Sequence, residues 1–172
     1  MKKKFLIILL VPALLLVLTG CSNNKKTIEL EDTKLGLKTT FTYDEKENYT
    51  DIEYDDAGAS KELEFENKNL DAEFQMYYVN MSDTSYKLSQ STRKAQKYYK
   101  EYTFNGYKGY AYSEYPDNIK LNILLKENDN KMYDVLFVSI DRIDNDNKVI
   151  MLDVLNKDEV QKFFNSMKFE KK

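Results

Sequence analysis

Apolar and polar side chains alternate along the chain from residue 27 onward, with the period of two that predicts half-buried antiparallel β-strands. Residues 27–31 and 37–43 predict two strands, with Gly36 in the turn between them. Residues 50–54 predict a third strand. The folded part of the chain is therefore expected to begin as β-structure.

Two further segments, 59–67 and 70–79, alternate most cleanly. A strand of this kind is buried on one face and solvated on the other. In the first segment, Leu63 and Phe65 face one side, and three glutamates face the other: Glu62, Glu64 and Glu66. The second segment has one apolar face, formed by Leu70, Ala72, Phe74, Met76 and Tyr78.

The pattern changes after residue 81 to the spacing of a helix. Ser82 or Asp83 can cap the helix, and its length is expected to be about eighteen residues. Side chains at spacings of four and three form the stripe expected to pack on the sheet: Leu88, Thr92, Ala95, Tyr99 and Tyr102.

The second half of the chain returns to strands. The dipeptide Asn105-Gly106 predicts a tight hairpin turn, because both residue types accept the positive φ that such a turn needs. The later elements are expected in the order strand, strand, helix and short strand, over residues 118–127, 131–141, 157–167 and 168–171. The second of these strands is apolar on both faces, which is typical of a central strand.

Strands that follow one another through tight turns imply an antiparallel sheet, which two helices far apart in the sequence can cover. The fold class expected is therefore α+β, with an antiparallel sheet of about six to seven strands covered by two main helices. The order of strands, helix, strands, helix and terminal strand requires no second domain.

The first residues of the chain have a different character. Lys2–Lys4 are positively charged, and Phe5–Leu18 are apolar apart from Pro12. A basic start, an apolar run and small residues are the order of a secretory signal. The apolar run is shorter than the about 20 residues that a membrane-spanning helix needs. These residues therefore predict export.

The end of this segment, Leu18-Thr19-Gly20-Cys21, resembles the lipobox of bacterial lipoproteins. The resemblance covers only the first residues, and it implies a diacylglyceryl group on the Cys21 sulfur and cleavage by signal peptidase II between Gly20 and Cys21. The alternatives are an ordinary cleaved signal or a buried free cysteine. The location that the lipobox implies is the extracytoplasmic face of the cell membrane.

Three parts are then expected along the chain: a signal peptide over residues 1–20, the lipidated cysteine and a short tether over 21–26, and a single α+β domain over 27–172. Cleavage removes three of the 26 basic residues and none of the 29 acidic ones, so the net charge falls from −3 to −6. This acidic balance argues against binding to nucleic acid.

The chain contains no histidine, and its single cysteine is assigned to the anchor. This excludes Ser-His-Asp and Cys-His catalysis, and no cofactor and no metal are expected. Asp144 and Asp146 resemble the start of a calcium loop, but Val149 and Leu155 stand where that loop needs Gly and Glu. A solvated turn is the favoured interpretation. The carboxylates left for an envelope hydrolase are Glu62, Glu64, Asp144 and Asp146.

The order of elements also resembles the Mog1/PsbP-like fold. The features that carry the resemblance are the strand-rich first third, a helix ending in YYKEY, the FNGYKGYAY turn and strand, two long strands, and the closing VQKFFNSMKF. The chain lacks the tryptophan and the proline-aromatic element common in that family. The resemblance implies a non-enzymatic interaction module, and it transfers no site residue to this chain.

Tyrosine is unusually frequent, with 14 residues. On a strand after the Asn105-Gly106 turn, Tyr110 and Tyr112 would share one face, and Tyr107 and Tyr115 the opposite one. Tyrosine combines a flat contact area with a hydroxyl, which suits contacts with proteins or sugars. These four tyrosines are the candidate interaction residues, and the alternative is that they pack the helix onto the sheet.

The sequence therefore predicts a lipid-anchored, extracytoplasmic and non-catalytic binding or protein-interaction module of the cell envelope. The expected partners are the membrane, through the lipid on Cys21, and another envelope protein. The alternatives are the carboxylate hydrolase and a lipoprotein that captures a small ligand beside the sheet.

Overall fold

A computed structural model describes residues 24–57, 60–144, 146 and 148–172. The signal segment, Gly20 and Cys21 lie outside these residues. No helix in the described part of the chain is long and apolar enough to cross a membrane.

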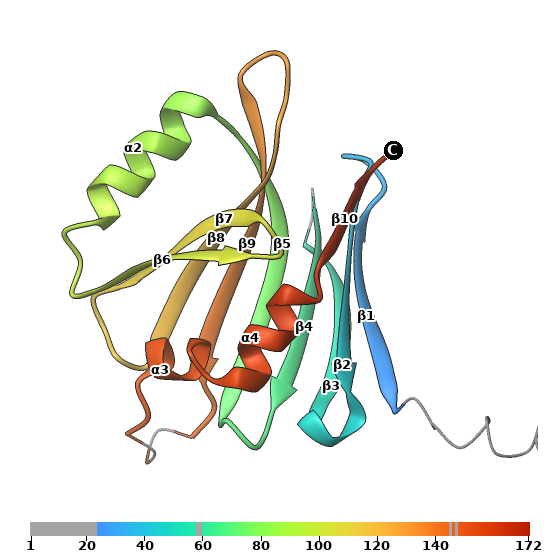
Figure 1. Ribbon diagram of the computed structural model, residues 1–172, viewed down its shortest axis with the longest axis vertical. Coiled ribbons are helices and arrows are strands. Elements are labelled where there is room, and N and C mark those ends of the chain that lie inside the picture. Colours follow the sequence, from blue (N-terminus) through green and yellow to red (C-terminus); the bar gives the residue numbers. More distant parts are fainter. Residues whose placement is uncertain (1–23, 58–59, 145, 147) are drawn as a thin grey trace, which may run out of the picture.

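Strands dominate the described chain, and three α-helices lie among them (Figure 1). The elements before the first of these helices are β1 (Lys25–Asp32), β2 (Leu37–Asp44), a 3-10 turn (Glu45–Glu47), β3 (Tyr49–Ala57), β4 (Ser60–Asn67) and β5 (Ala72–Ser82). The later ones are α2 (Asp83–Arg93), β6 (Tyr98–Phe104), β7 (Tyr107–Ser113), β8 (Asn118–Glu127), β9 (Met132–Arg142), α3 (Met151–Leu155), α4 (Asp158–Asn165) and β10 (Lys168–Lys171).

The strands form two antiparallel sheets. The larger has seven strands in the order β3-β4-β5-β9-β8-β7-β6, and the smaller has three in the order β1-β2-β10. The α+β class and the antiparallel pairing are confirmed. The expectation of one sheet covered by two helices is corrected, because β1, β2 and β10 form a sheet of their own. Each of these sheets has an apolar face, and packing the two faces together removes both from water.

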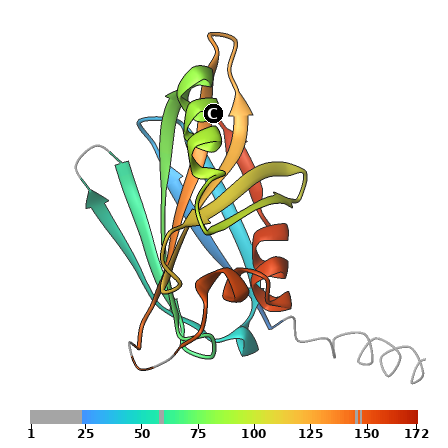
Figure 2. The same ribbon diagram turned by 90° about the vertical axis from the view of Figure 1, so that its left-hand side faces the viewer.

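The main core lies between the two sheets, and α3 and α4 complete it (Figures 1 and 2). Phe163 of α4 stacks on Phe41 of β2, with ring centroids 4.7 Å apart, and also contacts Phe65 of β4. Helix α4 therefore joins the small sheet to the large one. We call the core-facing side of the large sheet its inner face and the opposite side its outer face.

Helix α2 is shorter than the sequence pattern predicted. It ends at Arg93, and Tyr99 and Tyr102, which were assigned to its packing stripe, lie on strand β6. Leu88, also assigned to that stripe, is exposed, and Tyr86 is the buried residue of α2. Tyrosines suit a strand, and pairing β6 with β7 buries Tyr102 in the core, so tertiary packing outweighs the helical spacing.

Two other predictions are confirmed. Asn105 and Gly106 form the turn between β6 and β7, with positive φ angles of 48° and 87°. Strand β9 is central, because it pairs with β5 on one side and β8 on the other. The short helix α3 was not predicted, and β1 begins at Lys25, inside the predicted tether.

Candidate functional site

Helix α2 covers part of the outer face of the large sheet (Figures 1 and 2). Tyr86 packs edge-on against Tyr110 of β7 and Tyr133 of β9, with ring centroids 5.5 and 5.4 Å apart. The Tyr133 hydroxyl donates a hydrogen bond of 2.6 Å to Asp83, in the first turn of the helix. These contacts bury Val135 as well, and they fix α2 over one part of the face only.

The rest of the outer face, over β3, β4, β5 and β9, is lined with carboxylates. The strand register puts these side chains on the same side of the sheet in adjoining positions. We call this surface the acidic face, and it consists of Glu53, Asp55, Glu62, Glu64, Glu66, Glu73 and Asp141. Within the described ranges, Lys68 is the one cation that forms an ion pair with it, through Glu66 at 3.5 Å.

An aromatic pair lies at the edge of the acidic face. Tyr77 of β5 and Phe137 of β9 are direct cross-strand partners, and their ring centroids are 4.8 Å apart. Both side chains are only partly buried. Glu62 is the partner of Tyr77 on its other side, and Asn122 is the partner of Phe137, so carboxylates border the pair on the β4 side. The pair is an apolar contact surface beside a negatively charged one.

The carboxylates of this surface affect one another. Partial burial raises the pKa of Glu62, and the neighbouring charges of Glu64 and Asp55 raise it further. Partial burial likewise raises the pKa of Glu73, and Glu64, Asp141 and Glu66 add to the effect. Like charges held on one sheet face disfavour ionisation. The acidic face is therefore a place where an added positive charge relieves repulsion.

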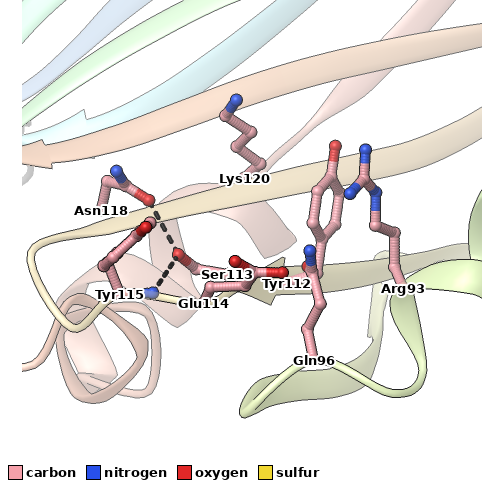
Figure 3. A pocket seen from close by; sticks show the side chains of 8 residues that line it. All are labelled: Arg93, Gln96, Tyr112, Ser113, Glu114, Tyr115, Asn118 and Lys120. Atoms are coloured by element: carbon pink, nitrogen blue, oxygen red, sulfur yellow. Dashed lines mark hydrogen bonds between the residues drawn. The ribbon is translucent and has the colours of Figure 1, made fainter.

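A cleft of about 280 Å³ opens where the chain leaves α2 and where β7 turns into β8 (Figure 3). Three of the residues that line it carry charge, and the others are tyrosines and polar side chains: Arg93, Glu114, Lys120, Gln96, Tyr112, Ser113, Tyr115 and Asn118. The Ser113 hydroxyl donates to Asn118 Oδ1 at 2.8 Å and accepts from the Tyr115 amide at 3.0 Å, which holds the β7–β8 turn in shape.

Two cations lie on either side of the Tyr112 ring. The Arg93 guanidinium carbon is 4.9 Å from the ring centroid, and Lys120 is the cross-strand partner of Tyr112. Figure 3 shows the polar ends of all three side chains pointing to the same side of the sheet. Neither Arg93 nor Lys120 forms an ion pair with a described residue. The cleft therefore has a positive edge in a net acidic chain.

The four candidate tyrosines lie in different environments: under α2, on the inner side of the sheet and at the cleft. Tyr110 is fully buried under α2, so it does not offer a contact surface, and Tyr107 packs against Phe169 on the inner side. Tyr112 is 8% exposed and lines the cleft, and Tyr115 is 62% exposed at its rim. The predicted sharing of a face by Tyr110 and Tyr112 is confirmed, and both contribute to packing beneath the helix.

Of the four carboxylates considered for a hydrolase, Glu62 and Glu64 lie beside each other on the acidic face, but Asp144 lies away from Glu62. Glu62 lies opposite Tyr77, whereas Asp144 follows Arg142, which lies opposite Ala72. Five residues of β5 separate these positions, or about 17 Å along the strand. Neither Glu62 nor Glu64 lines the cleft.

Asp144 and Asp146, the two acidic residues described in the loop after β9, are part of a turn. The Asp144 carboxylate accepts from the backbone amide of Asp146 at 2.9 Å, as in an ordinary turn. No group of three or more carboxylate, cysteine or histidine side chains suited to a metal ion occurs among the described residues.

Sequence reasoning did not single out Tyr77, Phe137, Arg93 or Lys120. A signal for Tyr77 was available, because an aromatic residue on the polar side of an alternating strand is unusual. The other three come together only through strand register and the end of α2. No known protein family, curated protein or solved structure matches this chain.

Proposed function

We propose that this protein is a lipid-anchored, extracytoplasmic and non-catalytic binding module, which docks another envelope protein on its acidic face. The observation that carries the proposal is the Tyr77–Phe137 pair, which is partly exposed and lies beside the carboxylates of β4 on a sheet face that α2 leaves open. Aromatic contact area ringed by polar groups is typical of protein interfaces.

Charge complementarity gives the partner its character. The acidic face has a single ion-paired cation among the described residues, at its margin. Partial burial raises the pKa values of Glu62 and Glu73, and repulsion from neighbouring carboxylates raises them further. A partner with lysines and arginines on its docking surface would relieve this repulsion and gain attraction. The occupant we propose is therefore a protein with a basic surface.

The location rests on the sequence. The Leu18-Thr19-Gly20-Cys21 motif supports a diacylglyceryl anchor on Cys21 after cleavage behind Gly20. Two acyl chains suffice for stable membrane attachment. In the lipid-anchored protein, Cys21→Ser should abolish lipid labelling and release the chain from the membrane fraction. Unchanged labelling of this variant would exclude the anchor.

The finer fold assignment belongs to the same proposal. A central antiparallel sheet, one helix in mid-chain and a closing helix and strand support a Mog1/PsbP-like arrangement, whose members bind partners without catalysis. The absence of histidine from the sequence supports a non-catalytic role. In this chain the arrangement includes a separate sheet, formed by β1, β2 and β10.

The docking test is photo-cross-linking in intact membranes. A photoreactive phenylalanine analogue replaces Tyr77 in one variant and Leu88, which is exposed on α2, in the control variant. We expect a defined cross-linked protein from position 77 and none from position 88. High salt should reduce the cross-link, because exposed charges are screened over about 8 Å at physiological ionic strength and over less in stronger salt.

Two outcomes would overturn the proposal. One is the absence of any specific product at position 77 while the anchor is intact. The other is an equal product at position 88, which would indicate non-selective proximity at the membrane.

A further inference from the structure

The cleft beside Tyr112 is electrostatically distinct from the acidic face. Arg93 and Lys120 reach it from two elements, the end of α2 and the start of β8, and no described carboxylate pairs with either. By contrast, Lys87 and Lys94 of the same helical region are both ion-paired, with Asp83 at 2.7 Å and Glu101 at 3.1 Å. The two unpaired cations favour a ligand with a negative group.

The Arg93 side chain is held in place for such a contact. Its guanidinium carbon lies 4.9 Å from the centroid of the Tyr112 ring, within the distance of a cation–π contact. A guanidinium held against an aromatic face keeps its N–H groups free to bind two oxygens of a carboxylate or phosphate. Lys120, beside the same ring, adds a second positive charge.

The remaining lining is suited to hydroxyl groups and to a flat ring. Glu114 and Asn118 provide acceptors and donors around the cleft, and Asn118 uses its oxygen for Ser113, which leaves its amide N–H groups available. Tyr115 is 62% exposed at the rim, so one face of its ring can stack on a ligand. A sugar combines hydroxyls with an apolar ring face.

The size of the cleft limits the ligand. Its volume of about 280 Å³ lies at the lower end of the range for small-molecule sites, which begins at about 300 Å³. The space suits one sugar ring with its charged substituent, and the rest of a longer polymer would extend into solvent.

We propose that this cleft binds an anionic saccharide, a sugar ring that carries a carboxylate or a phosphate. Arg93 and Lys120 hold the negative group, Glu114 and Asn118 bind hydroxyls, and Tyr115 stacks on the ring. The site adjoins the docking surface of the proposed function, because Asn118 is the cross-strand partner of Asp141, but its ligand is of a different chemical class.

The test uses the full-length protein in non-ionic detergent and follows arginine side-chain Nε–H signals by nuclear magnetic resonance. The chain has two arginines, and Arg142 is directed to the Val149 carbonyl, so its signal is an internal reference. The probes are glucuronate, glucose 6-phosphate, glucose and inorganic phosphate. We expect a saturable shift of the Arg93 signal with at least one anionic sugar, with a dissociation constant on the order of 1 mM.

The probe series separates the parts of the proposal. Glucose, without the charge, and inorganic phosphate, without the ring, should each bind at least about tenfold more weakly than the better anionic sugar. A preference for glucuronate would indicate an acidic sugar as the natural ligand, and a preference for glucose 6-phosphate a phosphorylated one. Equal binding of glucose, equal binding of phosphate, or no saturable shift with either anionic sugar would each overturn the proposal.

Matched variants locate the site. Arg93→Gln and Lys120→Gln should each weaken binding of the anionic sugars by about tenfold or more, as read from backbone amide signals near the cleft. Lys126→Gln removes the same charge from an exposed position on the same strand, and it should leave binding unchanged. Tyr115→Ala should weaken binding of the sugars and leave that of phosphate unaltered. An equal loss in the Lys126 variant would show that only net charge matters, which would contradict the site.

The docking proposal and the saccharide proposal can be disproved independently of each other. Loss of the cross-link at position 77 leaves the sugar titration unaffected, and absence of sugar binding leaves the cross-link unaffected. A dispersed amide spectrum in each variant serves as the check of folding.

Discussion

The ammonium group of Lys171 lies 2.6 Å from Oδ2 of Asp134, and this contact ties the small sheet to the large one. Asp134 is 2% exposed and also accepts hydrogen bonds from Asn80 at 2.8 Å and Asn128 at 3.1 Å. Burial opposes ionisation of this carboxyl group, but the hydrogen bonds from Lys171, Asn128 and Asn80 outweigh it and hold its pKa below the usual value.

Removing the cation from this contact should be costly. Lys171→Met leaves a buried carboxylate without its charged partner, and the free energy of unfolding should fall by about 1–3 kcal/mol. Lys172→Met is the matched control, because its partner Glu31 is partly exposed and solvent screening leaves such a pair little effect on stability. Denaturant unfolding of both variants checks this, and equal losses would contradict the special role of Lys171.

The pH dependence of this contact follows from the direction of the shift. The folded-state pKa of Asp134 lies below the unfolded-state value of 3.8, so its carboxylate contributes stability at neutral pH. That contribution is lost as the pH falls below about 4. The difference between the wild-type protein and Lys171→Met should therefore shrink in acid, which unfolding at a series of pH values would measure.

Gly109 allows β7 and β8 to approach closely. A Cβ atom added at this position would lie 2.6 Å from the backbone oxygen of Asn122 and 3.3 Å from Cα of Ile123, so Gly109→Ala should destabilise the fold by about 1–3 kcal/mol. Gly106, in the preceding turn, has open space around it but a φ of +87°. Ala there should cost about 1–2 kcal/mol through backbone strain alone.

Asparagine separates these two causes. Asn tolerates positive φ, so Gly106→Asn should retain more stability than Gly106→Ala. Gly109→Asn should be worse than Gly109→Ala, because the larger side chain meets the same backbone. Thermal unfolding of the four variants is the measurement, and the same rank order at both glycines would contradict this explanation.

These two glycines show what the sequence can and cannot predict. Asn105-Gly106 is a local signal, since the turn conformation is determined by the two residues themselves, and its prediction is confirmed. The need for glycine at position 109 arises from a strand that follows later in the chain, and nothing beside Gly109 indicates it. Local signals likewise predict the existence of most strands and of α4.

Pairing between strands that the sequence pattern does not reveal explains the predictions that were wrong. The spacing of Leu88, Tyr99 and Tyr102 fits a helix, but the hairpin partner β7 makes a strand of the tyrosines. Similarly, β1 and β2 alternate as strands of any sheet would. Their placement in a second sheet depends on the pairing of β2 with β10, at the other end of the chain. The candidate cleft depends on the same kind of contact, because Arg93 meets Tyr112 only when α2 has ended and β7 has paired.

Tyr86 is expected to hold α2, and through it the cleft, in place. Its ring contacts Tyr110 and Tyr133, and it is the buried side chain of the helix. Tyr86→Ala should cost about 3 kcal/mol or more, as for other buried aromatic residues, and should increase hydrogen exchange most strongly in α2. Leu88→Ala, at an exposed position on the same helix, is the control and should change stability by less than about 0.5 kcal/mol. Uniformly faster exchange over both sheets would show that α2 is not a separate unit.

Charge repulsion on the acidic face predicts a substitution that stabilises the protein. The folded-state pKa of Glu73 is raised by partial burial and by Glu64, Asp141 and Glu66, so the ionised form is disfavoured in the fold. The carboxylate therefore lowers stability as the pH rises from 4.5 through the folded-state pKa. Glu73→Gln should raise the free energy of unfolding at pH 7 by about 0.2–1 kcal/mol, and the gain should disappear near pH 3 and diminish in high salt.

The control substitution is not expected to raise the stability of the protein. Glu45 is ion-paired with Lys26 at 2.7 Å, so Glu45→Gln should leave stability unchanged or slightly reduced at pH 7. A loss of stability in Glu73→Gln would contradict the repulsion. If a basic partner docks on this face, the same variant should also form less of the cross-link from position 77, because the charge that lowers the stability of the free protein is the charge that attracts the partner. Stability and binding should therefore change in opposite directions in Glu73→Gln.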